Sequence, residues 1–384
     1  MTPEPSTPHL PAAPTALRFG YGTNGLADLR LDDALALLAD LGYDGVGLTL
    51  DHMHLDPLAP DLAARTRQVA RRLAALGLEV TVETGARYVL DPRRKHGPSL
   101  LDPDPADRTR RADLLIRAVR IAAELGAHAV HCFSGTLPPG TDEKTAWDRL
   151  ADTLTPVLAA ATAADIPLAV EPEPGHLLAT LADFHHLRHA LGDPSHLGLT
   201  LDIGHCQCLE PLPPADCVSA AAPWLRHVQI EDMRRGRHEH LPLGDGEIDF
   251  PAVLTALAAT GYQGLTVVEL PRHSHAGPHY AETSLPFLKA AARPPLTSEV
   301  SPVSPSAVAP RTNSSPVTSQ DTRAMSSSAA AAPQTGTSRT ATSPAAPVPG
   351  QTTSFRPPST PAPASAPTGT PSTEPSAPTE GTPA

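Results

Sequence analysis

The feature that most constrains the fold is a regular alternation of short apolar runs with longer amphipathic segments. Eight runs have the composition of β-strands, at 17–23, 45–50, 79–85, 127–135, 166–172, 197–204, 226–232 and 265–271. Between them, apolar residues recur at i, i+3, i+4 and i+7, the period of an α-helix, as at 31–42, 61–77 and 109–126. Eight successive β–α units predict a (β/α)8 TIM barrel over residues 17–292.

Two further features of these segments favour a parallel barrel. The strand-type runs are apolar throughout, as expected for strands that are covered on both faces. Five of the segments end in a glycine shortly before the next strand, namely Gly42, Gly77, Gly126, Gly192 and Gly261. Glycine commonly follows the last turn of a helix because it adopts the left-handed conformation at little cost.

The composition changes at both ends of the predicted barrel. Residues 1–16 and 293–384 consist mostly of Pro, Ser, Thr, Ala and Gly, and Phe355 is the only aromatic residue of the longer segment. Such segments cannot bury enough apolar surface to offset the entropy lost on ordering. We therefore predict that both ends are disordered.

The charge balance and the lack of targeting signals restrict the classes of partner. The formal net charge is −12, and an acidic surface repels the backbone of nucleic acids. No basic segment with an apolar run opens the chain, and no apolar run approaches the ~18 residues of a membrane span. We expect a cytoplasmic protein without a membrane partner, whose four cysteines, Cys132, Cys206, Cys208 and Cys217, are free thiols.

Polar side chains gather at the C-terminal ends of the predicted strands, where parallel barrels carry their catalytic residues. Six consecutive strands supply Glu83, His131, Glu171 with Glu173, Asp202 with His205, His227 with Glu231 and Asp232, and Glu269. Several carboxylates and imidazoles around one opening are costly to bury without a cation. The pattern predicts a divalent metal held by Glu171, Asp202, His227 and Glu269. Glu231 and Asp232 could instead form ion pairs with the following loop.

The segment EDMRRGRHEHLPLGDGEIDF, at 231–250, contains two histidines with several alternative roles. His238 and His240 are two residues apart, so their side chains point the same way in an extended segment. They could be metal ligands, substrate contacts or solvated residues. The stretch LGDGEIDF is interpreted as a structural turn into a helix that Asp249 caps. Arg272, just past the eighth strand, could bind a substrate phosphate or carboxylate, or point into solvent.

Four motifs resemble those of the xylose isomerase-like barrel superfamily, which includes sugar (phosphate) isomerases and epimerases and the apurinic endonuclease family 2 enzymes. The motifs are EP in LAVEPEPG, LDIGH, RHVQIED followed by LGDGEIDF, and VVEL. The resemblance implies a single divalent ion on the four ligands above, manganese, magnesium or cobalt, with zinc as an alternative. It also implies that Glu171 and Glu269 transfer the proton between neighbouring carbons through a metal-stabilised enediolate.

The implied substrate is a small sugar or sugar phosphate, and a homo-oligomer is compatible with this assignment. His205 would contact a substrate oxygen, and the other candidates for substrate binding are His131, His240, Glu83, His238 and Arg272. Two alternatives stay open. One is a zinc-dependent phosphodiesterase of the apurinic endonuclease type. Two residues count against it, because Glu83 stands where a histidine would be expected and His238 stands where an aspartate would be expected. The other is a non-catalytic barrel that acts as a scaffold.

Overall fold

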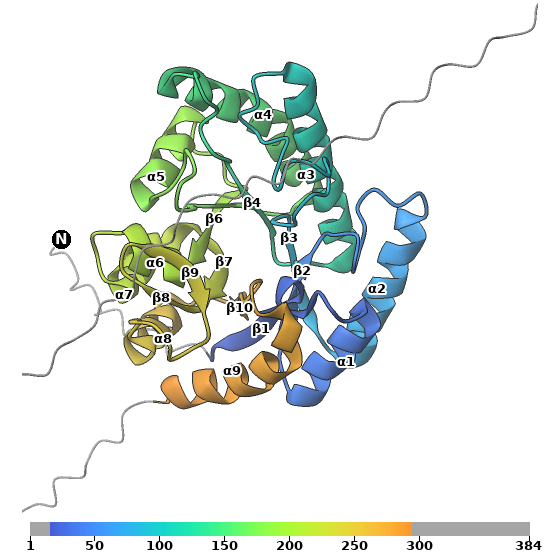
Figure 1. Ribbon diagram of the computed structural model, residues 1–384, viewed down its shortest axis with the longest axis vertical. Helices are drawn as coiled ribbons and strands as arrows, with labels where there is room; N and C mark the ends of the chain where they lie inside the picture. The colour runs from blue at the N-terminus through green and yellow to red at the C-terminus, as the bar shows by residue number, and fades with distance from the viewer. Residues whose placement is uncertain (1–15, 294–384) are drawn as a thin grey trace, which may run out of the picture. The chain divides into compact units, whose positions relative to one another are not determined.

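The strands form a closed parallel barrel, as the sequence predicts (Figure 1). The computed structural model describes residues 16–293, so the segments predicted to be disordered lie, apart from their innermost residues, outside the described part. The strand order around the barrel is β1-β10-β7-β6-β5-β4-β3-β2. The strands are β1 (Arg18–Gly22), β2 (Gly45–Thr49), β3 (Glu79–Glu83), β4 (Val130–Phe133), β5 (Leu168–Glu171), β6 (Leu197–Asp202), β7 (Leu225–Ile230) and β10 (Leu265–Val268).

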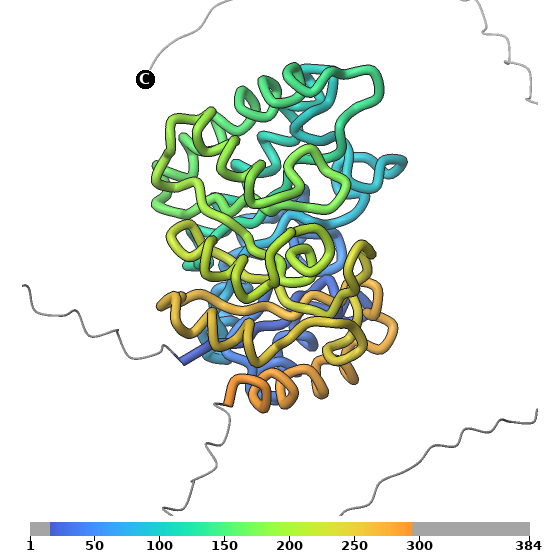
Figure 2. Tube along the Cα trace, turned by 90° about the vertical axis from the view of Figure 1, so that its left-hand side faces the viewer, coloured from blue at the N-terminus to red at the C-terminus, as the bar shows by residue number. Residues whose placement is uncertain are grey.

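Helices surround the barrel and cover its outer face (Figure 1). They are α1 (Leu31–Leu41), α2 (Leu62–Leu76), α3 (Pro105–Leu125), α4 (Glu143–Ala164), α5 (Leu181–Ala190), α6 (Ile203–Leu209), α7 (Pro214–Ala221), α8 (Phe250–Thr260) and α9 (Gly277–Ala291), with short 3₁₀ turns at Thr23–Leu26, Ala222–Trp224 and Ser274–Ala276. The ring closes where α9 lies beside α1, which both views show (Figures 1 and 2). None of these described helices combines the length and apolar character that crossing a membrane requires.

Local sequence signals set the helix boundaries. All five glycines predicted to end helices have positive φ, between 66° and 83°. Asp249 caps α8 as predicted, because its Oδ1 accepts a hydrogen bond from the N–H of Ala252 at 3.2 Å. Thr180 and Asp183 form a reciprocal capping box at the start of α5. These caps satisfy backbone groups that helix ends leave unpaired.

The hydrophobic core lies between the strands and the helices and continues into the barrel. Every residue of β2, β5 and β6 is buried, which explains why these strands read as apolar runs rather than as an alternating pattern. The predicted free thiols Cys132, Cys206, Cys208 and Cys217 are all buried and unpaired by disulfides. The core therefore fixes the strands, and the strand ends carry the polar residues.

One element differs from the expected loop. The segment after β7 folds into an antiparallel hairpin of β8 (Asp232–Arg234) and β9 (Arg237–Leu241). Strand β9 carries both His238 and His240 on one short extended segment. The hairpin therefore fixes these two histidines in a regular strand, beside α6 and its His205.

Candidate metal centre and active site

The C-terminal ends of the strands enclose a cavity of about 620 Å³. Its lining includes His131, Glu171, Glu173 and Glu269 from the strand ends and the adjoining loops. His238 and His240 line it from the hairpin, and Arg272 from the loop after β10. This is the position at which parallel barrels bind their substrates.

Asp202 has two roles at the end of β6. Its Oδ1 accepts a hydrogen bond from the N–H of His205 at 2.8 Å and so caps α6. Its Oδ2 is buried without a hydrogen-bond partner among the described residues. A buried carboxylate oxygen without a partner is costly. The free oxygen is therefore available to a cation.

Four side chains meet at this carboxylate: Asp202, Glu231, His240 and Glu269 each bring one ligand atom within 4.8 Å of the others. His240 Nδ1 lies 3.6 Å from Glu231 Oε1 and 3.9 Å from Glu269 Oε2. Within the part of the chain that the structure describes, neither oxygen of the fully buried Glu231 has a hydrogen-bond partner, and nor does His240 Nδ1. Gly204 in α6 makes room for this carboxylate, because a Cβ at that position would overlap it.

The electrostatics of the four residues fit a divalent cation. Burial raises the pKa of Glu231, and the carboxylates of Asp202 and Glu269 raise it further. Burial together with Glu171 and Asp202 likewise raises the pKa of Glu269. Burial lowers the pKa of His240 to about 3, so its ring is neutral at pH 7. Mutually repelling carboxylates beside a neutral imidazole are the donor set that a divalent ion relieves.

Glu171 occupies a second part of the same centre. One ligand atom each of Glu171, Asp202 and His205 lies within 4.8 Å of the others. His131 Nε2 is 2.6 Å from Glu171 Oε2, and the N–H of Thr84 donates to His131 Nδ1 at 3.4 Å. Burial opposes protonation of His131, yet the Glu171 carboxylate raises the pKa of this ring. Although burial opposes it, this contact with His131 holds the pKa of Glu171 well below its usual value.

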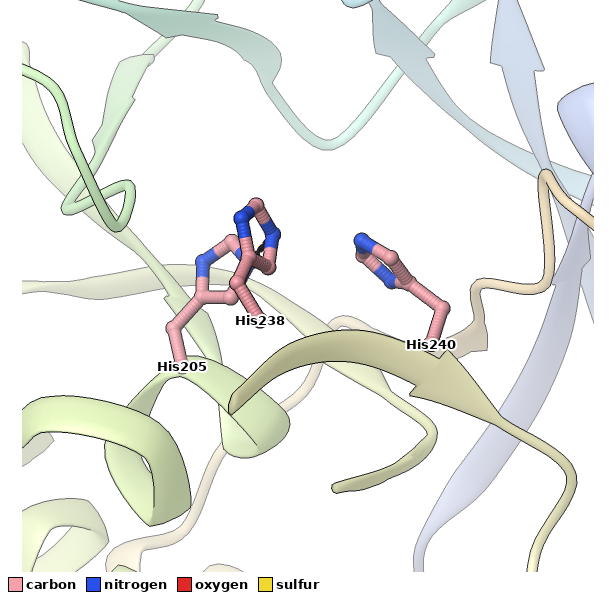
Figure 3. A group of neighbouring side chains, drawn as sticks. All are labelled: His205, His238 and His240. Atoms are coloured by element: carbon pink, nitrogen blue, oxygen red, sulfur yellow. Dashed lines mark hydrogen bonds between the residues drawn. The ribbon is translucent and has the colours of Figure 1, made fainter. Parts of the chain in front are cut away.

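Three histidines form a further cluster at the edge of the cavity (Figure 3). His205 Nε2 is 3.2 Å from His238 Nε2, and the rings of His238 and His240 are 5.3 Å apart between centroids. Burial, with the neighbouring His205, lowers the pKa of His238 to about 4. The cluster shares His240 with the four-residue group and His205 with the Glu171 group. It therefore offers nitrogen ligands next to the carboxylates.

The structure differs from the predicted ligand set at His227. Its Nε2 lies 3.2 Å from Glu83 Oε1, and Glu83 Oε2 accepts a hydrogen bond from Thr49 Oγ1 at 3.1 Å. Among the described residues, no group of potential ligand atoms includes either His227 or Glu83. The strand register gives the reason: His227 pairs with Thr200, two residues before Asp202 on β6.

Glu231, for which the sequence leaves an ion pair with the following loop as an alternative, is a member of the four-residue group. Side chains two apart along a strand point the same way. The side chains of His227, Gln229 and Glu231 therefore lie on one face, and Glu231 is just past the end of β7. Because Gln229 pairs with Asp202, Glu231 lies beyond that level, toward the mouth of the barrel. Gln229 itself is buried, and its Oε1 has no partner among the described residues. Counting alternate residues from His227 would have indicated both side chains.

Asp232 has a structural role. Its carboxylate accepts backbone N–H groups of Met233 at 2.9 Å, Gly244 at 2.9 Å and Ile248 at 3.2 Å. These bonds hold the turn between β9 and α8, as the structural interpretation of LGDGEIDF predicts.

We expect Asp232→Ala to lower the free energy of unfolding by roughly 1–3 kcal/mol, because buried N–H groups lose their acceptor. Chemical denaturation measures this loss. Asp245→Ala is the matched control, since Asp245 is exposed in the same turn. Equal stability of the two variants would contradict this role of Asp232.

The closed parallel barrel, with carboxylates and imidazoles around its C-terminal mouth, defines the class as a (β/α)8 barrel with candidate metal ligands. The family model of the xylose isomerase-like TIM barrel matches residues 35–291, more than half of the chain. The chain belongs to this family.

Known proteins similar to this chain are sugar epimerases. An L-ribulose 3-epimerase of Mesorhizobium japonicum is 27% identical over 245 residues, which cover 62% of this chain and 74% of that protein. An L-ribulose-5-phosphate 3-epimerase of Escherichia coli is 23% identical over 241 residues, which cover 62% of this chain and 81% of that protein. The solved D-allulose 3-epimerase from Methylomonas sp., in complex with D-allulose, superposes with a TM-score of 0.58 at 21% identity, covering 74% of this chain and 100% of that one. This last likeness shows the shared fold.

Proposed function

We propose that this protein is a divalent-metal-dependent epimerase or isomerase of a small sugar. The observation that carries the proposal is the group of buried ligand atoms on Asp202, Glu231 and His240 that lie close together and have no hydrogen bond among the described residues. The sequence relatives, which are ketopentose epimerases by name, support the sugar class of substrate.

The four-residue group is the proposed site of the ion. Asp202, Glu231, His240 and Glu269 offer three carboxylates and one imidazole. Oxygen ligands suit manganese or magnesium, and the nitrogen ligand extends the choice to cobalt or zinc. When bound, the ion supplies positive charge beside the carbonyl and hydroxyl oxygens of the substrate, which acidifies the C–H between them.

Two carboxylates on separate strands would move the proton. Glu171 and Glu269 both line the cavity, at the ends of β5 and β10. Glu171 is held in its ionised form by His131, so it can accept a proton from the substrate carbon. Glu269 would return a proton from the other side. Asn24 Nδ2 donates to Glu269 Oε1 at 2.9 Å and orients this carboxylate.

Solvent exchange tests the proposed chemistry. The full chain, loaded with Mn²⁺, is incubated with a panel of ketoses in deuterated water, and the sugars are analysed by NMR. We expect deuterium at the carbon next to the carbonyl, because the abstracted proton exchanges with solvent before it is returned. Asp202→Asn should abolish this exchange, whereas Glu282→Gln, an exposed position on α9, should not. Lack of exchange with every ketose would contradict the proposal.

A second candidate function is phosphodiester hydrolysis with several metal ions. The three-histidine cluster of Figure 3 is the observation that favours it, because it could hold an ion in addition to the carboxylate site. The same preparation, loaded with Zn²⁺, is therefore incubated in parallel with duplex DNA that contains an abasic site. Strand incision without deuterium exchange would favour the hydrolase over the epimerase.

A further inference from the structure

Three cations at the rim of the cavity are not neutralised by the protein. Arg87, Lys95 and Arg272 all line the cavity and are exposed. Within residues 16–293, the hydrogen bonds that Arg87 and Arg272 donate go to backbone carbonyls: Arg87 Nη2 to Pro271 O at 3.2 Å, and Arg272 Nη2 to His238 O at 3.3 Å. None of the three forms an ion pair in that range. Their charges therefore remain available to a ligand.

A neighbouring arginine, by contrast, is neutralised by carboxylates. Arg94, next to Lys95 in the chain, contacts the carboxylates of Asp91, Asp102 and Asp107 at 2.7, 3.2 and 2.8 Å. Arg94 does not line the cavity, whereas Lys95 does. Carboxylates such as Asp51 and Glu173 line the same cavity, yet none of the described carboxylates forms an ion pair with the three cations. This distribution favours an anionic ligand there.

The loop that carries two of the three cations is held in a fixed conformation. Tyr88 has a φ of 60°, in the left-handed region, and its N–H donates to Lys95 O at 2.7 Å. A non-glycine residue in this region is conformationally strained, and such strain is concentrated at functional sites. The bond from Arg87 to Pro271 O ties this loop to the loop after β10, next to Arg272. The three cations therefore occupy positions that the structure defines.

The electrostatic effect of these cations reaches into the cavity. His96, which also lines it, packs edge-on against Phe133 with a centroid distance of 5.6 Å. Burial, together with the charges of Lys95, Arg111 and Arg87, lowers the pKa of His96 to about 4. This side of the cavity is positive, whereas the floor holds carboxylates. An elongated ligand with one anionic end therefore fits in one orientation.

We propose that the substrate carries an anionic group, a phosphate or a carboxylate, at the end remote from the reacting carbons, and that Arg87, Lys95 and Arg272 bind this group. The inference rests on the proposed sugar chemistry at the floor of the cavity and specifies the class of sugar. Guanidinium groups bind planar carboxylates and phosphates through paired N–H donors. The carboxylates at the floor repel the anionic end, so the hydroxy-carbonyl end of the sugar is directed to Glu171 and Glu269.

Calorimetric titration of the full chain with Mn²⁺ present tests this inference through binding affinity rather than through activity. The probes are L-ribulose 5-phosphate, L-ribulose and the keto-uronate D-fructuronate, so that phosphate and carboxylate are compared with a neutral ketose. We expect an anionic probe to bind roughly 10-fold tighter than L-ribulose or better, as one charge-assisted hydrogen bond supplies. The probe with the larger gain identifies the anion.

Single variants locate the effect. Arg87→Gln and Arg272→Gln should each reduce affinity for the anionic probe at least about 5-fold more than for L-ribulose. Arg93→Gln is the matched control, because this exposed arginine lies two residues from Lys95 but does not line the cavity. Equal affinity for charged and neutral ketoses, or equal losses for Arg93→Gln, would overturn the inference. Selective anion binding without deuterium exchange would contradict only the epimerase function.

Discussion

Glu269→Gln is expected to abolish measurable epimerisation while the barrel remains folded. The change removes one acid/base group, which contributes roughly 10²–10⁴-fold to the rate, and it also weakens a ligand of the proposed ion. The side chain is partly exposed at the end of β10 and contributes little to the core. Turnover number and the thermal melting curve together measure the effect.

The control for this variant is Glu282→Gln on the exposed face of α9. Both substitutions remove one negative charge, so a general charge effect would appear in both. If Glu269→Gln retained at least half of the activity, Glu269 would have no part in proton transfer. If it unfolded, Glu269→Asp would separate folding from chemistry, because it keeps the carboxylate but moves it.

The second large effect is expected from a pair of variants on β7 and the residue that follows it. Glu231→Gln should weaken Mn²⁺ binding by at least roughly 10–100-fold, because even the loss of a residue that hydrogen-bonds to a metal ligand has an effect of this size. His227→Gln should instead lower the free energy of unfolding by roughly 1–3 kcal/mol, because the buried Glu83 carboxylate loses its contact with the His227 ring. Equilibrium dialysis and denaturation measure the two effects.

The opposite result would restore the ligand set predicted from the sequence. If His227→Gln lost the ion and Glu231→Gln kept it, the metal would lie deeper in the barrel, near Glu83. Gln207→Glu is a suitable charge control, because Gln207 lies on α6 near these residues but outside every candidate ligand group of the described chain.

The fold could be predicted from the sequence because its signals are local. Each strand is a short apolar run, and apolar residues recur in each helix at helical spacing. Glycines in the left-handed conformation mark the ends of five helices. The parallel barrel then follows from the number of units. No long-range information was needed for these features.

Which residues belong to the site could be predicted only in part, because this depends on how far each strand extends toward the C-terminal mouth of the barrel. Asp202 and Glu269 stand at the ends of their strands, where the sequence pattern predicts ligands. His227 was assigned to the same level, yet the register between β6 and β7 places it beside Thr200. The offset between neighbouring strands is a property of the closed barrel and is not visible in one strand's sequence.

The residues on the hairpin and the long loop were harder still to place. The sequence leaves three alternative roles for His238 and His240, because it does not indicate the hairpin β8–β9 that aligns them. Arg87 and Lys95 carry no sequence pattern that relates them to Arg272. Only the folded chain brings the loops after β3 and β10 to one rim.

The most direct measurement is anomalous X-ray scattering from crystals of the full chain grown with Mn²⁺. The account predicts a single strong peak within about 2.0–2.6 Å of oxygen or nitrogen atoms of Asp202, Glu231, His240 and Glu269. A peak bound by His227 and Glu83, or no peak at the mouth of the barrel at saturating Mn²⁺, would contradict it.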